Sequence, residues 1–454
     1  DITSMPDCLV MTSGNRSGTP ICHNDDEAIQ ELSNLCDVIL SNNRSIHIRA
    51  DDTVMDYFDD RPYMIRRSRG YAPLPFILSE PFRGQVLAIG GELKNTFCLA
   101  KDNTFYPSAY LGDMADLRTV KALEQSVSLM KSLLQIEPSL VVCDMHPKYN
   151  TTMIANRLNL PVLQVQHHYA HVVSCMAEND YSGDVIGVSF DGTGYGIDGT
   201  IWGGEYLLAN YQGFKRIGSI EPYVQAGGDL STKEGWRIAV SMLYSIYGER
   251  ATNIIEKLSI CNTTMAKVVC SMIDRRINSV TSTSVGRLFD GVSAILGIKK
   301  VSTYEGDAST TLQYYAEEYI HSNHIVLNSS NSVLTVDEAI SNLQDRFTIR
   351  TSRIVKYLVD SLLDGADRYE LAYKFHQMLT EYVVLGCINS YKITKVKTFA
   401  LTGGVFQNRL LLSLCVNRLR SLGYTVLTNS AIPPNDGGIC LGQAVVGMYS
   451  INNE

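Results

Sequence analysis

The sequence predicts an α/β protein whose larger part consists of two similar lobes. Its 454 residues are too many for one ordinary hydrophobic core, so two or three domains are expected. Short apolar runs of strand length alternate with segments whose apolar residues recur every three or four positions. The order of these segments is repeated once along the chain, and a mostly helical stretch interrupts the second copy.

The first lobe is expected at about residues 83–184, and its first apolar run ends at Gly90-Gly91. Its segments are, in order, a strand from Val86, strands at 96–100 and 104–107, a helix at 119–135, a strand at 140–143, a second helix, and a strand at 162–166 that leads into a third helix. The order is therefore β-β-β-α-β-α-β-α.

The second lobe is expected at about residues 185–454. Its segments are strands at 185–190, 205–209 and 214–220, a helical insertion at about 225–395, a strand at 398–401, a helix from Asn408, a strand at 425–428 and a final helix. Within the insertion, Ala239, Met242, Leu243 and Ile246 have helical spacing. Two β-β-β-α-β-α units are what the duplicated lobes of an actin-like or sugar-kinase-like (ribonuclease-H-like) fold require.

Residues 1–78 are expected to be a separate piece. They open on the strand-like run Cys8-Leu9-Val10-Met11 and a turn-rich segment, as the middle of a domain would. Two prolines, Pro73 and Pro75, indicate the boundary, and the next domain should begin near Arg83.

The composition argues against several classes of protein. The net charge is -8, with 39 basic and 47 acidic residues, so a surface that coats nucleic acid is not expected. The eleven cysteines are scattered without CxxC pairs, which is typical of reduced thiols in the cytoplasm. No apolar run approaches the roughly 20 residues that cross a bilayer. We expect a cytoplasmic protein without a nucleic-acid or membrane partner.

A histidine run, Gln166-His167-His168-Tyr169-Ala170-His171, lies where a predicted strand leads into a helix. His167 and His171 are four residues apart, so on a helix they share one face and can share a metal ion. Packed structural histidines are the alternative, and a carboxylate from elsewhere in the chain would favour the metal.

Two aspartates can supply that carboxylate. Asp191 is followed by Gly192, Thr193 and Gly194, and Asp436 by two more glycines. Glycine-rich turns after strands let backbone N–H groups approach phosphate oxygens, and an aspartate there can hold a bridging cation. Ordinary Asp-Gly turns remain possible, although two of them at equivalent positions of a repeat favour a functional site.

Further candidates for nucleotide contacts follow the same logic. In the turn from Gly403-Gly404 to Gln407-Asn408, the glycines permit close approach and the Asn408 amide can reach a sugar or base. Arg287 and Asp290 are candidates for a phosphate and a ribose hydroxyl, or else form a surface pair on a helix.

The N-terminal piece offers candidates of its own. Ser13 and Asn15 lie in a glycine-bearing turn, and the basic run Arg66, Arg67 and Arg69 can neutralise a triphosphate or simply form a solvated surface. His376 is interpreted as a packed helical histidine.

Together these segments resemble the HypF family of hydrogenase maturation carbamoyltransferases over essentially the whole chain. The C-terminal part is also similar to tRNA threonylcarbamoyl transferases and antibiotic O-carbamoyltransferases. The resemblance rests on the turn with Ser13 and Asn15, the run Arg66-Arg67-Ser68-Arg69-Gly70-Tyr71-Ala72-Pro73, Gly90-Gly91-Glu92-Leu93-Lys94-Asn95-Thr96, Asp144-Met145-His146-Pro147, the histidine run, Phe190-Asp191-Gly192, Trp202-Gly203-Gly204-Glu205, Gly286-Arg287-Leu288-Phe289-Asp290, Gly403-Gly404-Val405-Phe406-Gln407-Asn408 and Asp436-Gly437-Gly438.

The resemblance implies two linked activities. Residues 1–78 would be the C-terminal portion of a YrdC-like domain, which in the family makes carbamoyl-adenylate from ATP and carbamoyl phosphate. Residues 83–454 would pass the carbamoyl group to the C-terminal cysteine of the partner HypE, on the path to the cyanide ligands of NiFe hydrogenase.

The resemblance also implies the ligands and their residues. ATP is the implied cofactor, with iron or zinc at His167, His171, Asp191 and Asp436, and magnesium possible nearer the phosphates. The residues implied to bind nucleotide are Gly192, Thr193, Gly194, Gly204, Asp290, Gly403, Gly404, Gln407, Asn408, Ser13, Asn15 and Arg67.

The sequence departs from the family pattern in places. The acylphosphatase-like domain, the zinc fingers and the first half of the YrdC-like domain would lie before Asp1, so a truncated protein is expected. Ala109-Tyr110 stands where Gln-His is expected, Lys233 and Gly235 where arginine and proline are, and Ser309 where a second alanine is.

Two rival functions remain open. One is carbamoyl or threonylcarbamoyl transfer to another acceptor, an antibiotic hydroxyl or a tRNA. The other is a non-catalytic nucleotide-binding scaffold, but a scaffold needs no metal, so the four metal-ligand candidates favour an enzyme. No protein nucleophile is implied, so direct transfer without a carbamoyl-enzyme intermediate is expected.

Overall fold

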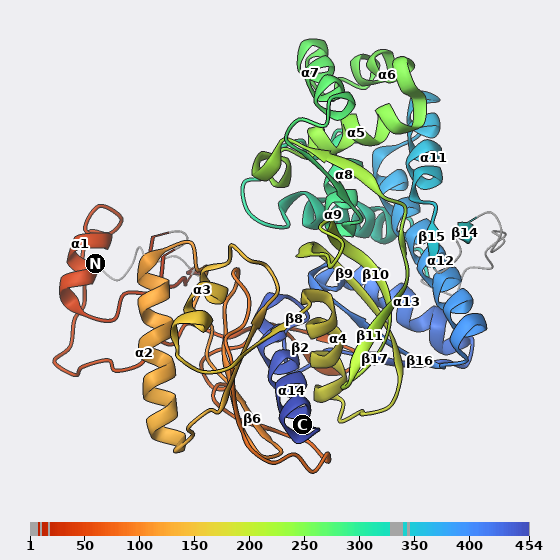
Figure 1. Ribbon diagram of the computed structural model, residues 1–454. Coiled ribbons are helices and arrows are strands. Elements are labelled where there is room, and N and C mark those ends of the chain that lie inside the picture. The colour runs from red at the N-terminus through yellow and green to blue at the C-terminus, as the bar shows by residue number, and fades with distance from the viewer. Residues whose placement is uncertain (1–7, 10, 17–18, 327–338, 343–345, 454) are drawn as a thin grey trace.

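The computed structural model describes residues 8–9, 11–16, 19–326, 339–342 and 346–453. It has two lobes, with α4 (His167–Glu178) and α14 (Ile439–Asn452) lying side by side between them (Figure 1). Each strand and helix expected in the two lobes is present, so the predicted α/β class is confirmed.

A six-stranded sheet forms the centre of the first lobe. Its order is β3-β6-β5-β4-β7-β8, and β4 pairs antiparallel with β5 and parallel with β7. Its elements are β3 (Phe76–Ile77), β4 (Gln85–Ala88), β5 (Cys98–Lys101), β6 (Thr104–Pro107), β7 (Leu140–Asp144) and β8 (Val162–Val165), with helices α2 (Leu117–Leu134) and α3 (Asn150–Arg157). Strand β7 is buried along its whole length, as a central parallel strand covered on both faces should be.

A second sheet repeats this arrangement. The five-strand path β11-β10-β9-β16-β17 has the same order as β6-β5-β4-β7-β8, which confirms the duplicated actin-like and sugar-kinase-like fold. Its elements are β9 (Val185–Tyr195), β10 (Ile201–Asn210), β11 (Gly213–Ile220), β16 (Thr398–Thr402) and β17 (Thr425–Thr428), with η4 (Gly404–Gln407), α13 (Arg409–Ser421) and η5 (Asp436–Gly438).

The insertion is mostly helical, as expected, but it also adds short strands to the second sheet. β15 lies parallel to β11, and β13 lies parallel to β10. Its elements are β12 (Tyr223–Ala226), η2 (Gly228–Thr232), α5 (Gly235–Tyr247), η3 (Gly248–Arg250), α6 (Ala251–Lys257), α7 (Thr263–Asp274), β13 (Ser279–Ser282), α8 (Val285–Ile295), α9 (Asp307–Ser322), β14 (Ile340–Asn342), β15 (Phe347–Ile349), α11 (Thr351–Leu363) and α12 (Arg368–Thr394).

The N-terminal piece contains α1 (Asp25–Leu32) and the hairpin of β1 (Val54–Phe58) and β2 (Arg61–Arg66). The strand predicted at residues 8–11 is wrong for Cys8, Leu9 and Met11, which have no regular structure, while Val10 lies outside the described residues. β3 comes before the expected start of the next domain near Arg83, and yet it pairs with β6 of the first lobe. Among the described helices, none is long and apolar enough to span a membrane.

The β1–β2 hairpin is packed into the second lobe. Tyr63 and Met64 of β2 are almost completely buried, and Tyr63 belongs to the core of that lobe. The Tyr63 hydroxyl donates to the Phe406 carbonyl at 2.8 Å, and the Met64 N–H donates to the Ser430 carbonyl at 2.8 Å. The N-terminal piece therefore supports the loops that precede α13 and η5.

We predict that Tyr63→Ala destabilises the second lobe, although Tyr63 lies in the N-terminal piece. Loss of a buried aromatic ring should cost roughly 3–5 kcal/mol of unfolding free energy. Tyr63→Phe is the matched control, because it removes only the hydroxyl and should cost about 1 kcal/mol. Denaturant unfolding of both variants checks this, and equal stability of Tyr63→Ala and the parent would contradict it.

Glu178, the last residue of α4, holds the turn that follows β17. Its carboxylate accepts hydrogen bonds from the backbone N–H groups of Ser430, Ala431 and Ile432, with Ser430 at 3.0 Å and Ile432 at 3.3 Å. Burial raises the pKa of Glu178 to about 7, although the N–H donors oppose this effect. The helix that carries the histidines is thereby tied to the segment that leads to Asp436.

This raised pKa predicts a pH-dependent stability. The unfolded pKa of glutamate is about 4.3, so the native state retains a proton that the unfolded chain releases above that pH. The resulting stabilisation is complete below about pH 4.3 and is lost as the pH rises through about 7. Between these values, the unfolding free energy of the parent should fall relative to Glu178→Gln by roughly 3 kcal/mol. Parallel pH curves in denaturant unfolding would show that Glu178 does not titrate in this range.

Candidate metal and nucleotide site

The two predicted metal-binding histidines occupy the first turns of a buried helix. α4 begins directly after Gln166, whose side-chain oxygen accepts the Tyr169 N–H at 2.9 Å and so caps the helix. His167 and His171 lie one turn apart, with ring centroids 4.9 Å from each other, and both are 1% exposed. The shared face that the spacing predicts is confirmed.

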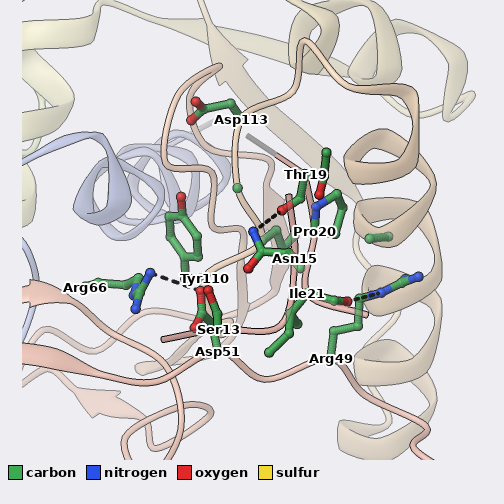
Figure 2. Close-up of a pocket in the computed structure, with 13 residues that line it drawn as sticks. Ser13, Asn15, Thr19, Pro20, Ile21, Arg49, Asp51, Arg66, Tyr110 and Asp113 are labelled. Atoms are coloured by element: carbon green, nitrogen blue, oxygen red, sulfur yellow. Dashed lines mark hydrogen bonds and ion pairs between the residues drawn. The ribbon is translucent and has the colours of Figure 1, made fainter. Parts of the chain in front are cut away.

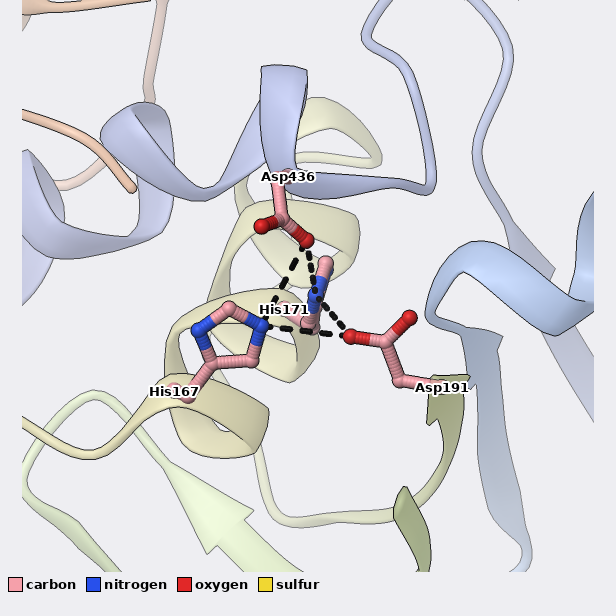
Figure 3. A group of neighbouring side chains, drawn as sticks. All are labelled: His167, His171, Asp191 and Asp436. Carbon is pink, nitrogen blue, oxygen red and sulfur yellow. Dashed lines mark hydrogen bonds and ion pairs between the residues drawn. The ribbon is translucent and has the colours of Figure 1, made fainter. Parts of the chain in front are cut away.

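Asp191 and Asp436 lie opposite these histidines, as Figure 3 shows. His167 Nε2 is 3.2 Å from Asp191 Oδ2 and 3.5 Å from Asp436 Oδ1. His171 Nε2 is 3.4 Å and 3.8 Å from the same two oxygens. One potential ligand atom from each residue lies within 4.8 Å of the other three. Three segments far apart in sequence thus converge on one point.

Asp191 reaches this position from a strand, and the predicted glycine-rich turn after it is wrong. β9 continues through Asp191 to Tyr195, and Gly194 pairs with Trp202 of β10. A Cβ at Gly194 would lie only 2.3 Å from the His168 ring. Because glycine has no Cβ, the strand can continue past this ring. The tight turn comes later, where the Gly196 N–H bonds the Thr200 carbonyl.

Asp144 orients His167 and was not predicted as a site residue. Its carboxylate lies 2.8 Å from His167 Nδ1, which leaves Nε2 directed at Asp191 and Asp436. A carboxylate behind a metal-binding histidine is a common way to fix its ring and tautomer. The sequence signal was the position of Asp144 at the end of β7, beside the parallel strand that leads to His167.

The electrostatics of the cluster fit a bound cation. Burial lowers the pKa of His167, but the carboxylates of Asp436, Asp144 and Asp191 outweigh it and raise the pKa well above the usual value. Burial raises the pKa of Asp191, yet His167 and His171 hold it well below its usual value. His171 Nε2 is buried and makes no hydrogen bond to any described residue. Two imidazole nitrogens and two carboxylate oxygens are a suitable ligand set for zinc or iron.

The cluster opens onto a cavity of about 320 Å³ between the lobes. The cavity is lined by Asp56, Ile65, Lys94, Asp191, Gly192, Gly286, Arg287, Phe289, Asp290, Glu305, Gly306, Ser309, Thr310, Gln313, Tyr314, Gly404, Val405, Gln407, Asn408, Arg409, Asn435 and Asp436. It therefore includes Gly192, Asp290, Gly404, Gln407 and Asn408 from the predicted nucleotide contacts.

The other predicted glycines of the second lobe do not line this cavity. A Cβ at Gly204 would lie 2.4 Å from the Thr283 carbonyl, and one at Gly403 would lie 2.2 Å from the Phe190 carbonyl. These two glycines permit close backbone packing beneath the site, whereas Gly194 makes room for the His168 ring. Thr193 donates its hydroxyl to the adjacent Gly192 carbonyl.

Asn408 lines the cavity with both polar atoms of its side chain hydrogen-bonded, and Asp290 lines it in an ion pair. Asn408 Oδ1 accepts the Leu411 N–H at 3.0 Å and caps α13, and its Nδ2 donates to His376 Nε2 at 2.9 Å. Burial lowers the pKa of His376 to about 4, so this ring is a neutral acceptor. Asp290 Oδ2 lies 2.7 Å from Arg287 Nε. Asn408 thus shapes the cavity wall, and a ribose contact of Asp290 must compete with Arg287.

A second cavity, of about 100 Å³, lies where the N-terminal piece meets the first lobe (Figure 2). Ser13 and Asn15 line it, together with Arg66, Tyr110 and Asp113. Tyr110, which departs from the family pattern, is therefore part of this wall.

Arg67 does not line the second cavity as the triphosphate contact would require. Its buried guanidinium donates to the carbonyls of Tyr71 and Leu74 at 2.7 Å and of Pro107 at 3.2 Å. Side chains alternate along a strand, so Arg66 rather than Arg67 faces the cavity.

Models of known protein families match most of the chain. The family model described as a carbamoyltransferase Kae1-like domain, second subdomain, matches residues 187–443, and the HypF Kae1-like domain matches 82–178. The Sua5/YciO/YrdC model, described as telomere recombination, matches residues 2–68.

Relatives are similar along nearly the whole chain. The probable carbamoyltransferase HypF of Methanocaldococcus jannaschii is 32% identical over 98% of this chain and 56% of its own length. The carbamoyltransferase HypF of Synechocystis sp. is 33% identical over 97% of this chain and 57% of its own. A carbamoyltransferase HypF homolog of Cupriavidus necator is 31% identical over 80% of this chain and 91% of its own. The chain thus spans little more than half of the first two relatives.

Solved structures have the same architecture. The crystal structure of full-length HypF in its phosphate- and nucleotide-bound form superposes with a TM-score of 0.88 at 34% identity, over 97% of this chain and 67% of that one. The structure of HypF from T. kodakarensis gives a TM-score of 0.87 at 30% identity, over 98% of this chain and 57% of that one.

We predict that His171→Ala lowers bound iron or zinc to near zero, because it removes one of about four ligands. Asp144→Asn should weaken metal affinity by about 10–100-fold, because His167 loses the carboxylate that orients it. His321→Ala, an exposed histidine on α9, is the control and should keep its metal. Elemental analysis after dialysis, with melting temperatures, checks this; full metal content in a folded His171→Ala protein would exclude the site.

Proposed function

Because this chain belongs to the HypF family of carbamoyltransferases, we propose that it transfers a carbamoyl group from carbamoyl-adenylate to a cysteine thiol. The acceptor would be the C-terminal cysteine of a HypE-type partner, and the product would lead to the cyanide ligands of NiFe hydrogenase in the cytoplasm. The observation that supports this proposal is the cluster of His167, His171, Asp191 and Asp436 at the end of a nucleotide-sized cavity.

The four residues would hold the metal, which when bound would act as a Lewis acid towards the carbamoyl carbonyl or the adenylate phosphate. Asp144 fixes the His167 ring, and the Gly404 N–H bonds Asp191 Oδ1 at 3.2 Å, which fixes that carboxylate. The ligands are thus held in place before any substrate binds, which limits the reorganisation that the reaction requires.

The transfer itself needs one bond exchange. The thiolate sulfur forms a bond to the carbamoyl carbon, and the bond from that carbon to the adenylate oxygen breaks, so AMP leaves with the electron pair. The thiol proton passes to solvent. The described residues around the cavity include no cysteine, so the architecture favours direct transfer without a carbamoyl-enzyme intermediate.

Formation of carbamoyl-adenylate from ATP and carbamoyl phosphate belongs, in this proposal, to the second cavity. Arg66 there pairs with Asp51 at 3.0 Å, and Asn15 and Ser13 add polar groups. Arg66 lies in this cavity and can meet phosphate groups, which is the role that the resemblance implied for Arg67.

We predict that the two steps separate on mutation. With pre-made carbamoyl-adenylate and a partner protein ending in cysteine, His171→Ala should lower thiol carbamoylation by about 100-fold or more, because the metal is lost. Arg66→Ala should leave this transfer intact and slow carbamoyl-phosphate-dependent ATP–pyrophosphate exchange. Mass spectrometry of the partner's terminal peptide measures transfer, and a partner ending in serine is the control.

Other outcomes identify the rival functions. Carbamoylation of an antibiotic hydroxyl or of tRNA, with none of the thiol, would show that the acceptor is not a cysteine. Binding of ADP and metal without transfer to any acceptor would indicate the non-catalytic nucleotide-binding scaffold.

A further inference from the structure

Lys94 lies beside the candidate metal site in a conformation that few lysines adopt. It belongs to the loop between β4 and β5 and has a φ of 47°, in the left-handed region. Its N–H is held by Asp113 Oδ1 at 2.8 Å. Non-glycine residues in this region cost energy, and they persist where surrounding contacts require them.

The loop of Lys94 is fixed to the turn that carries Asp436. The Thr96 hydroxyl donates to the Gly437 carbonyl at 2.8 Å, and the Lys94 carbonyl lies beside Gly437. The Lys94 side chain lines the same cavity as Asp191 and Asp436. Burial lowers the pKa of Lys94, but Glu305 and Asp436 outweigh it and raise the pKa, so the ammonium stays charged.

The ammonium of Lys94 is paired with a carboxylate from the other side of the cavity. Its partner is Glu305, which lies just before α9 in the insertion and is 60% exposed at its side chain. By contrast, the Arg287–Asp290 pair in the same cavity is almost completely buried. The Lys94 side chain is only 28% exposed, so the pair is solvated mainly on the side of Glu305, where a phosphate that enters the cavity can replace the carboxylate.

Metal binding would change the electrostatics around Lys94. Asp191 and Asp436 would then be neutralised by the cation, and Lys94 would lose the attraction of Asp436. The Lys94 ammonium would then keep its pair with Glu305 and could also bind an anion that enters the cavity beside the metal.

We propose that Lys94 binds the phosphate of the adenylate, and that Glu305 pairs with the Lys94 ammonium only until that phosphate displaces Glu305. The identity of the anion rests on the proposed function, whereas the exchange of Glu305 for a phosphate does not. In the transfer step, the bond from the carbamoyl carbon to the phosphate oxygen breaks and negative charge grows on that oxygen. Lys94 is placed to stabilise this charge, so it is a catalytic residue for the departure of AMP.

The test is titration of inorganic phosphate, and separately of AMP, into the metal-loaded full chain by calorimetry. Lys94→Met should lower the affinity for both anions by about 10–100-fold, since a charge-assisted hydrogen bond is lost. Lys94→Arg should retain most of the affinity. Glu305→Gln should tighten binding by about two- to fivefold, because the competing carboxylate is gone. Lys121→Met, on the exposed surface of α2, is the control for loss of a lysine.

A structural role would give a different pattern. If the Lys94–Glu305 pair only holds the lobes together, Lys94→Met and Glu305→Gln should lower phosphate affinity and melting temperature alike, and the proposal is overturned. Unchanged phosphate affinity in folded, metal-loaded Lys94→Met also overturns it. Failure of the chain to carbamoylate any thiol, with the predicted affinities intact, would remove the proposed function and leave the phosphate site.

Discussion

The close packing of α4 on α14 is the contact on which the candidate site depends. α4 follows the first-lobe sheet in sequence but packs against β9 and β16 of the second, whereas α14 follows the second sheet and packs against β4 and β5 of the first. A Cβ at Gly442 would lie 2.0 Å from the Ala170 carbonyl, so only glycine permits this separation. Ser174 adds a hydrogen bond to the Gly438 carbonyl at 2.8 Å. The contact brings His167 and His171 within reach of Asp436.

Strand β2 gives the N-terminal piece a part in both cavities. Ile65 lines the cavity between the lobes, and its neighbour Arg66 lines the second one. Asn435, beside Asp436, donates to the Ile65 carbonyl at 3.0 Å and caps η5 with its side-chain oxygen. Because successive residues of a strand point to opposite sides, this one strand separates the two cavities. The two halves of the proposed reaction would therefore share a wall.

Charge in the main cavity is balanced pair by pair among the described residues. Arg287 faces Asp290, Arg409 faces Asp56 at 2.8 Å, and Lys94 faces Glu305. The carboxylates of Asp191 and Asp436 instead face two histidines, and these four side chains are the candidate ligands of a metal ion. This difference sets the cluster apart from the ion pairs around it.

The order of the elements and the residue types of the site could be predicted from the chain alone. The repeated order of strands and helices predicted the duplicated lobes, because local apolar patterns follow from the chain. The spacing of His167 and His171 predicted their shared face, because helical geometry is local as well.

Which polar atoms remain available to a ligand could be seen only in the folded protein. Arg67 and Asn408 have the right chemistry for ligand contacts. The Arg67 guanidinium instead donates to the nearby carbonyls of Tyr71 and Leu74 and to that of Pro107 in the first lobe, and Asn408 bonds His376 and the start of α13. Asp144 comes to lie beside His167, and Lys94 in the cavity with Asp436, only because strands and loops far apart in sequence pack together. Buried donors and acceptors must find partners, and those partners are set by packing between segments that no local pattern relates.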